Sequence, residues 1–135
     1  MHYNIAERLR KTLSNMGYPV ESHQFDAHST IEISFSNIPS LFFSVIDERL
    51  WLWSALSWMD SSTLSSWGTE LWEELQEAIC WVVTGQPVLG LGSEGYELKA
   101  LVDDACFDEE TNLEALLEAF YVLCLRLNER FSQSR

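Results

Sequence analysis

Two apolar runs separated by three charged residues constrain the fold of this chain more than any other feature. The runs are LFFSVI, residues 41–46, and LWLWSAL, residues 50–56, with DER between them. A connection this short joins antiparallel strands and is too short for a parallel crossover. The preceding STIEISF, residues 29–35, alternates apolar and polar side chains, as a half-buried strand does. We therefore predict a three-stranded antiparallel meander.

The run at 50–56 is apolar on both of its faces. Successive side chains of a strand point to opposite faces. The two sets are Trp51, Trp53 and Ala55 on one face and Leu50, Leu52, Ser54 and Leu56 on the other. One set is expected to cover the helices of its own subunit, and the other to help floor a groove for a partner or a second copy. The alternative, that helices cover both faces, stays open.

Three further segments have helical spacing, and two more have the pattern of strands. A helix capped by Asn4 ends before Gly17, a second follows Ser61 or Ser62 and runs into CWVV, and a third begins with a capping box at Thr111. Residues 87–92 and 96–102 predict two strands joined by SEG, with Gly95 at positive φ. The expected order is α-β-β-β-α-β-β-α, an α+β fold with an antiparallel sheet packed with three helices. We expect one domain over residues 1–135.

The charge of the chain limits its partners. Acidic residues outnumber basic ones 21 to 8, which gives a formal net charge of −13. Nucleic acids and anionic membrane surfaces favour Lys and Arg, so neither is expected as a partner. No apolar run approaches the roughly 20 residues that span a bilayer, and the N-terminus lacks a secretory signal pattern. The charge favours a neutral or basic partner, or it serves only to keep an apolar protein soluble.

The sequence contains no pattern that predicts catalysis. His23 and His28 flank Asp26, which is a weak metal-site signal, and a turn role for Asp26 is the preferred interpretation. The glycine-rich GLGSEG runs from strand to strand, so it lacks the helix N-terminus of a phosphate site. No nucleophile, base and oxyanion site come together. We therefore predict a protein that is not an enzyme and binds no nucleotide, cofactor or metal.

The cysteines give no framework for a disulfide or a metal site. The chain has an odd number of cysteines, namely Cys80, Cys106 and Cys124. All three lie in apolar surroundings, and no two of them have the spacing of metal ligands. We expect three reduced, buried and inert thiols.

The chain has more apolar surface than a small domain can bury. The helix predicted after Ser62 carries a core stripe and, off that stripe, Trp72, Ile79 and Trp81. Exposed apolar surface of this kind marks interaction sites, and a second copy of the chain is the simplest partner. The expected dimer-interface residues are Leu71, Trp72, Leu75 and Ile79. The expected groove for a bound segment is formed by Leu9, Leu13, Ile31, Ile33, Phe35, Phe43 and Val45.

Two stretches of the chain resemble a known family. FDAHSTIEISFSNIPSLFFSVIDERLWLWSAL, residues 25–56, is similar to the corresponding stretch of type III secretion chaperones of the InvB/SpaK kind, the class IB chaperones. YELKALV, followed by an acidic segment and an amphipathic helix containing FY, resembles the C-terminal third of that family.

The resemblance implies a function and a set of partners. It implies a cytosolic bacterial homodimer that binds the N-terminal segments of effector proteins and keeps them extended and secretion-competent. It also implies delivery of these segments to the secretion ATPase, with no hydrolysis by the chaperone itself. The alternative is an adaptor or regulatory subunit that binds a folded protein partner through apolar patches.

Overall fold

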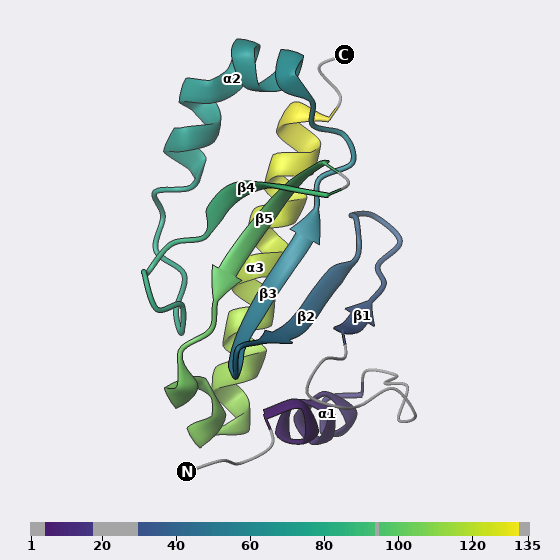
Figure 1. Ribbon diagram of the computed structural model, residues 1–135, viewed down its shortest axis with the longest axis vertical. Coiled ribbons are helices and arrows are strands. Elements are labelled where there is room, and N and C mark those ends of the chain that lie inside the picture. The colour runs from purple at the N-terminus through teal and green to yellow at the C-terminus, as the bar shows by residue number, and fades with distance from the viewer. Residues whose placement is uncertain (1–4, 18–29, 94, 133–135) are drawn as a thin grey trace.

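The computed structural model describes residues 5–17, 30–93 and 95–132 of the chain (Figure 1). Its elements confirm the α+β class and the predicted order, with one short 3₁₀ helix added before the last helix. In chain order they are α1 (Ile5–Asn15), β1 (Thr30–Ile33), β2 (Leu41–Ile46), β3 (Arg49–Ala55), α2 (Ser61–Glu74), β4 (Val88–Gly92), β5 (Gly95–Leu101), η2 (Asp104–Asp108) and α3 (Glu110–Phe131).

The strands form one antiparallel sheet in the order β1-β2-β3-β5-β4. The predicted meander is confirmed as β1, β2 and β3, and the predicted hairpin as β4 and β5. Ile46 pairs with Arg49, so Asp47 and Glu48 alone make the first turn, with φ values of 52° and 62°. Two positive φ angles are the signature of the turn that matches the twist of a β-hairpin. Gly95 has a φ of 131°, as the sequence predicts for the second hairpin.

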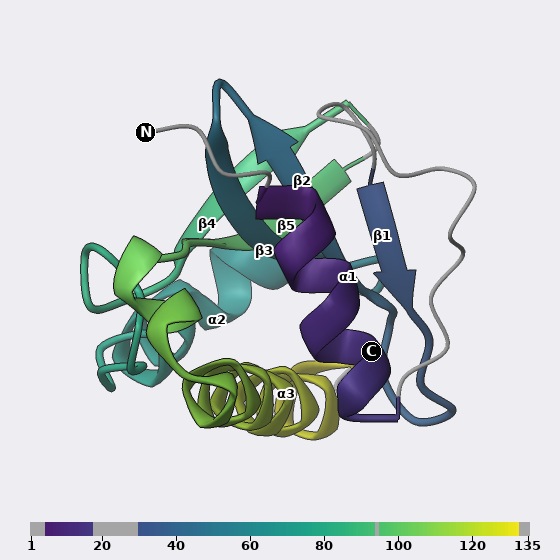
Figure 2. The ribbon, with the colours of Figure 1, turned by 90° about the horizontal axis from the view of Figure 1, so that it is seen from below.

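Helix α3 runs along one face of the sheet, and α1 lies across the lower end of the molecule (Figure 1). Seen from below, α3 forms a layer of its own under the strands, and no described helix lies on the opposite face of the sheet (Figure 2). We call the face toward α3 the inner face and the opposite face the outer face. Within the described part of the chain, helices therefore cover one side of the sheet only.

The core fills the space between the inner face and the helices. Leu52, Leu98 and Phe120 are each fully buried in it, and Phe43 is 1% exposed. Leu50, Leu52, Ser54 and Leu56 are thus the set of side chains that faces the helices, which answers the question left open by the sequence. The buried Ser54 hydroxyl donates to the carbonyl oxygen of Ser40 at 3.2 Å, so its burial leaves no unpaired group.

Helix α2 is shorter than the sequence predicts. It is capped by the Asp60 carboxylate, which accepts from the Thr63 amide, and not by Ser61 or Ser62. It ends at Glu74, whereas the apolar periodicity continues to Val82. The segment beyond it bonds to the sheet instead: Val83 N donates to Leu101 O at 2.9 Å, and Val82 forms a bridge with Val102. Backbone pairing with the end of β5 therefore outweighs continuation of the helix.

The last helix also begins earlier than predicted. Glu109 is its N-cap residue and makes no capping hydrogen bond through its side chain, so the expected capping box at Thr111 is wrong. Thr111 lies in the first turn of α3, because the 3₁₀ helix η2 ends at Asp108 and leads directly into α3.

An ion-pair network joins α2 to α3. Glu74 Oε1 lies 2.6 Å from Arg126 Nε, and Glu74 Oε2 lies 2.5 Å from Arg130 Nη1. Partial burial by itself raises the pKa of Glu74, but the hydrogen bonds and charges of the two arginines outweigh it. The pKa of Glu74 therefore lies below its ordinary value of 4.5. A carboxyl with a lowered pKa stabilises the fold above the unfolded value, and this contribution is lost as the pH falls through the folded value.

A Glu74→Gln variant is expected to lose about 1 kcal/mol of unfolding free energy at pH 7, since the arginines are partly solvated. The loss should shrink in urea titrations below pH 4.5, where the parent's Glu74 also becomes protonated. Glu129→Gln, at an exposed site on α3, is the matched control. A loss that stays constant down to acid pH would contradict the role of the ion pairs.

Candidate partner-binding surfaces

The described residues hold no arrangement that predicts metal chemistry. Within residues 5–17, 30–93 and 95–132, no three His, Cys, Asp or Glu side chains cluster as a metal site would require. The candidate metal ligands His23, Asp26 and His28 lie outside the described residues. None of the described helices is long and apolar enough to span a membrane.

The outer face of the sheet carries a row of aromatic side chains. Phe42 pairs with Trp53 across β2 and β3, and their rings stack with centroids 4.4 Å apart. Trp51 is half-buried beside them, and Ile46 is 54% exposed at the hairpin end. The Trp51, Trp53 and Ala55 set therefore faces away from α3. The two sets of side chains have different environments, as the strand geometry requires.

A buried serine orders this aromatic row. The Ser44 hydroxyl accepts from Trp53 Nε1 at 2.9 Å and lies 3.0 Å from the Thr30 hydroxyl. These bonds fix the indole ring of Trp53 against β2 and link it to the edge strand β1. The Phe42–Trp53 pair is therefore held in place on the outer face.

The predicted groove residues lie mostly beneath the surface. Five of them are buried in the core of this protomer, namely Leu9, Leu13, Ile31, Ile33 and Phe43. Phe35 and Val45 are partly buried and pack against that core. Helix α1 thus covers residues that the sequence predicts for a groove, and the accessible part of the set is Phe35 and Val45.

A hollow of about 460 Å³ opens beside Phe35. We call it the Phe35 hollow. Phe35 contacts Tyr121 of α3 with ring centroids 4.9 Å apart, and Asn37 donates to the Tyr121 hydroxyl at 2.8 Å. The lining residues are Met16, Phe35, Glu114, Leu117, Glu118 and Tyr121. The end of α1, the loop after β1 and α3 therefore form a surface that is apolar at its base and acidic at its rim.

The predicted dimer residues separate into buried and exposed ones. Leu71, Leu75 and Ile79 are 2%, 9% and 6% exposed, so they pack within the protomer. Trp72 is 63% exposed. Trp72 is thus the one of the four with a side chain available to a partner in the described structure.

Trp72 belongs to a larger apolar surface formed by α2 and β4. Val88 and Leu91 of β4 are 49% and 72% exposed. A hollow of about 360 Å³, lined in part by Trp72, Pro87 and Val88, lies between the helix and the strand. We call this region the α2–β4 surface. β4 is an edge strand of the sheet, so a partner here can contact both apolar side chains and the free strand edge.

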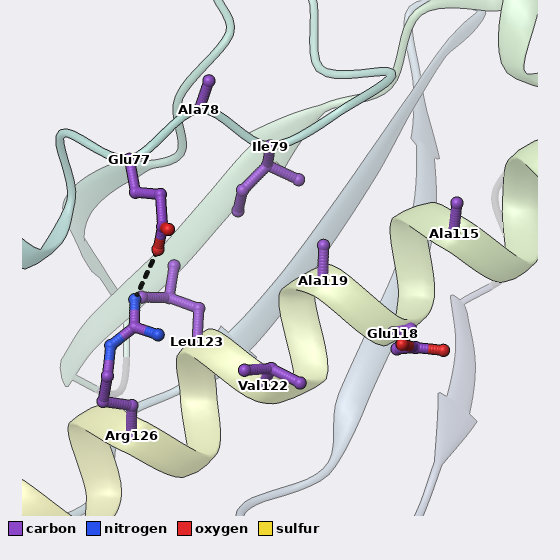
Figure 3. A pocket seen from close by; sticks show the side chains of 9 residues that line it. All are labelled: Glu77, Ala78, Ile79, Ala115, Glu118, Ala119, Val122, Leu123 and Arg126. Atoms are coloured by element: carbon purple, nitrogen blue, oxygen red, sulfur yellow. Dashed lines mark hydrogen bonds and ion pairs between the residues drawn. The ribbon is translucent and has the colours of Figure 1, made fainter.

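A further hollow of about 420 Å³ lies between α3 and the segment that follows α2 (Figure 3). We call it the Ile79 hollow. Ile79 points toward Ala119 of α3, and an ion pair of 3.1 Å between Glu77 and Arg126 lies at one end. The remaining lining residues are Ala78, Ala115, Glu118, Val122 and Leu123. Glu118 also lines the Phe35 hollow, so the two hollows adjoin on α3.

The cysteine prediction holds for two of the three residues. Cys106 and Cys124 are buried, and burial raises the pKa of each thiol to about 12, which keeps them protonated and unreactive. Cys80 is exposed, so its predicted burial is wrong. The prediction rested on apolar neighbours in the sequence, but Cys80 lies beyond the end of α2 at Glu74, where these neighbours do not bury it.

Several of these surface residues were not predicted from the sequence. Tyr121 and Val122 belong to the last helix, for which the sequence predicted an amphipathic pattern and no partner-binding residue. The exposed positions of Val88 and Leu91 follow from the edge position of β4, which depends on strand order. The stretch VLGLG, apolar with two glycines, was the one available signal for them.

The fold and these surfaces define a small acidic α+β protein with apolar regions that its own helices leave uncovered, as is typical of protein-binding modules. Comparison with known proteins then identifies its family. Residues 18–93 match the model of the invasion protein B family. The chain belongs to that family, which confirms the resemblance to the InvB/SpaK proteins and places it in a secretion-associated group.

Two relatives are similar over most of the chain. Both carry the name surface presentation of antigens protein SpaK, one from Salmonella typhimurium and one from Salmonella typhi. Each is 30% identical over 121 residues, which cover 89% of this chain and 90% of the relative. The similarity therefore extends over the α and β elements alike.

Proposed function

We propose that the protein is a cytosolic type III secretion chaperone that holds the N-terminal segments of effector proteins in an extended, secretion-competent form. The observation that carries this proposal is the uncovered apolar surface in a member of the invasion protein B family. A segment kept unfolded in solution exposes apolar side chains, and a preformed apolar surface can bind them. We expect the protein to catalyse no reaction. We also expect residues 1–135 to act as one domain.

The proposed site for the effector segment is the Phe35 hollow with the adjoining edge of the sheet. Among the described strands, β1 pairs with β2 alone, so its other edge can receive an extended strand. Phe35 lies two residues after the end of β1 and packs against the core, so a strand added there would run past the hollow. The buried members of the predicted groove, Leu9, Leu13, Ile31, Ile33 and Phe43, would support this site from below. Val45, the remaining member of that set, does not line the Phe35 hollow and pairs with Leu50 near the β2–β3 hairpin.

A Phe35→Ala variant is expected to weaken capture of an effector N-terminal segment by about tenfold or more, because a large aromatic contact is lost. The dissociation constant can be measured with a fluorescently labelled segment. Val83 is an exposed apolar residue that does not line the Phe35 hollow. Val83→Ala should therefore leave the dissociation constant within about twofold of the parent's. Equal effects of the two changes would contradict the assignment.

Limited proteolysis tests the chaperone function itself. A co-expressed effector segment should become resistant to cleavage in the complex and be cleaved rapidly when released. The effector segment should not have to be folded before it binds, since its ordering and its binding occur together. A complex that forms with a folded partner and leaves an N-terminal segment fully sensitive would favour the adaptor alternative.

We propose a homodimer joined at the α2–β4 surface. Exposed Trp72 and Leu91 provide apolar area next to a free strand edge, and symmetric pairing of one such surface with itself forms a closed dimer. Two protomers then give one assembly with two effector sites. Delivery to the secretion ATPase is part of the same proposal, and neither nucleic acid nor membrane is an expected partner.

A further inference from the structure

The Ile79 hollow is separate from the surfaces proposed for the effector segment and the second protomer. It shares Glu118 with the Phe35 hollow, but its base is formed by Ile79, Ala119 and Val122 (Figure 3). Val122 is 46% exposed and lines this hollow together with buried Ile79. An open apolar base of this kind can accept side chains of a partner.

Backbone hydrogen bonds hold the hollow open without a ligand. Ile79 N donates to Gly85 O at 2.8 Å, and Asp103 N donates to Trp81 O at 2.8 Å. These bonds fasten the segment after α2 to itself and to the end of the sheet. Trp81 has a φ of 66°, a conformation that a bulky side chain adopts only when its surroundings impose it. The wall opposite α3 is therefore fixed in place, which reduces the entropy cost of binding.

The shape of the base favours a helix as the occupant. Ala115 and Ala119 are four residues apart on α3 and project to the same side, with Val122 one turn further on (Figure 3). Small side chains at this spacing allow another helix to approach closely. The backbone groups of α3 bond within the helix, so this wall offers no edge for an added strand. A helix with apolar side chains three and four residues apart fits this base.

The charges around the hollow favour a basic occupant. The Glu77 side chain is 74% exposed, and Glu118 is exposed as well. Arg126 is the basic residue in the lining, and it is already paired with Glu74 and Glu77. With a net charge of −13 on the chain, Lys and Arg side chains beside the apolar stripe would be attracted to this rim.

A second copy of the chain does not offer such a helix among its described elements. α2 contains no basic residue in its described sequence SSTLSSWGTELWEE. α1 carries basic residues, but its apolar Leu9 and Leu13 are 1% and 0% exposed within its own protomer. α3 carries Arg126 and Arg130, but both are already paired with Glu74 or Glu77 of their own protomer. The occupant is therefore a helix from a different protein.

We infer that the Ile79 hollow binds a basic amphipathic helix of a partner protein, with small or branched apolar side chains in the hollow and Lys or Arg on both flanks. The apolar base of this hollow is distinct from that of the effector site, and the two share Glu118 at the rim, so one protomer can hold an extended segment and a helix side by side.

The test uses a fluorescein-labelled 18-residue peptide with Ala, Val and Leu on one helical face and Lys on the flanks. Its affinity is measured by anisotropy with the full-length protein. A peptide of the same composition in shuffled order removes the apolar face and keeps the charge. Two pairs of protein variants complete the design, namely Val122→Gln with Val83→Gln, and Glu118→Lys with Glu129→Lys. Val83 and Val122 are 48% and 46% exposed, so they form a matched pair.

The ordered peptide should bind at least about tenfold more tightly than the shuffled one. Val122→Gln and Glu118→Lys should each weaken binding by about fivefold or more, while Val83→Gln and Glu129→Lys change it by less than about twofold. Amide chemical shifts should change at residues 77–79 and 115–126. Equal binding of the two peptides, equal effects within each variant pair, or shifts confined to other surfaces would each overturn the inference.

Discussion

Replacing Trp72 by glutamate is expected to convert the proposed dimer into a folded monomer. The side chain is 63% exposed in the protomer, so the change removes little from the protomer's own core. In the dimer the same change would place a carboxylate in an apolar contact, which costs several kcal/mol unless the charge is paired. We expect the dimer dissociation constant to rise by about 100-fold or more. Light scattering across a concentration series measures it.

The control for this change is Ile46→Glu. Ile46 is also a large exposed apolar residue, at 54%, but it lies at the β2–β3 hairpin. It should leave the dissociation constant within about threefold. A stable dimer in the Trp72→Glu protein, or equal dissociation in both variants, would show that the α2–β4 surface is not the interface. Ile79→Asp is less informative, because Ile79 is 6% exposed and its replacement also disturbs the core.

The second large effect is a difference in stability between substitutions on the two faces of β3. Leu52→Ala should lower the free energy of unfolding by about 2–5 kcal/mol, because it leaves a cavity at a fully buried position. Trp51→Leu, one residue earlier on the outer face, should lower it by about 1 kcal/mol or less. Urea titrations at a single protein concentration make the comparison, since the stability of a dimer depends on concentration. Equal losses would mean that both faces of β3 are covered.

The fold was predictable wherever short-range chemistry decides it. The two-residue turn at Asp47 and Glu48 fixes the β2–β3 hairpin, and Gly95 fixes the β4–β5 hairpin, because both depend on turn geometry within a few residues. The end of α2 was not predictable in the same way. Its apolar period continues to Val82, but pairing between Val82 and Val102 draws that segment to the sheet. A contact between residues 20 positions apart is invisible to periodicity.

The candidate surfaces were predictable only in part. The doubled apolar faces of 50–56 and the exposed Trp72 were apparent from the sequence. The sequence could not show whether Trp51 or Leu52 points outward, because the direction depends on which face of the sheet α3 covers (Figure 2). The groove prediction rested on apolar positions in α1 and the first two strands, and the structure puts five of these seven residues in the core. Alternation identifies a buried face but does not say whether a helix or a partner buries it.

Hydrogen exchange of the protein with and without a bound effector N-terminal segment tests the proposed function most directly. The account predicts slower exchange at the amides of β1 and around Phe35, because an added strand bonds to the free edge of the sheet. It also predicts protected amides in the effector segment at alternate positions, as in an extended strand. Protection confined to a folded domain of the partner, with exchange at β1 and Phe35 unchanged, would contradict it.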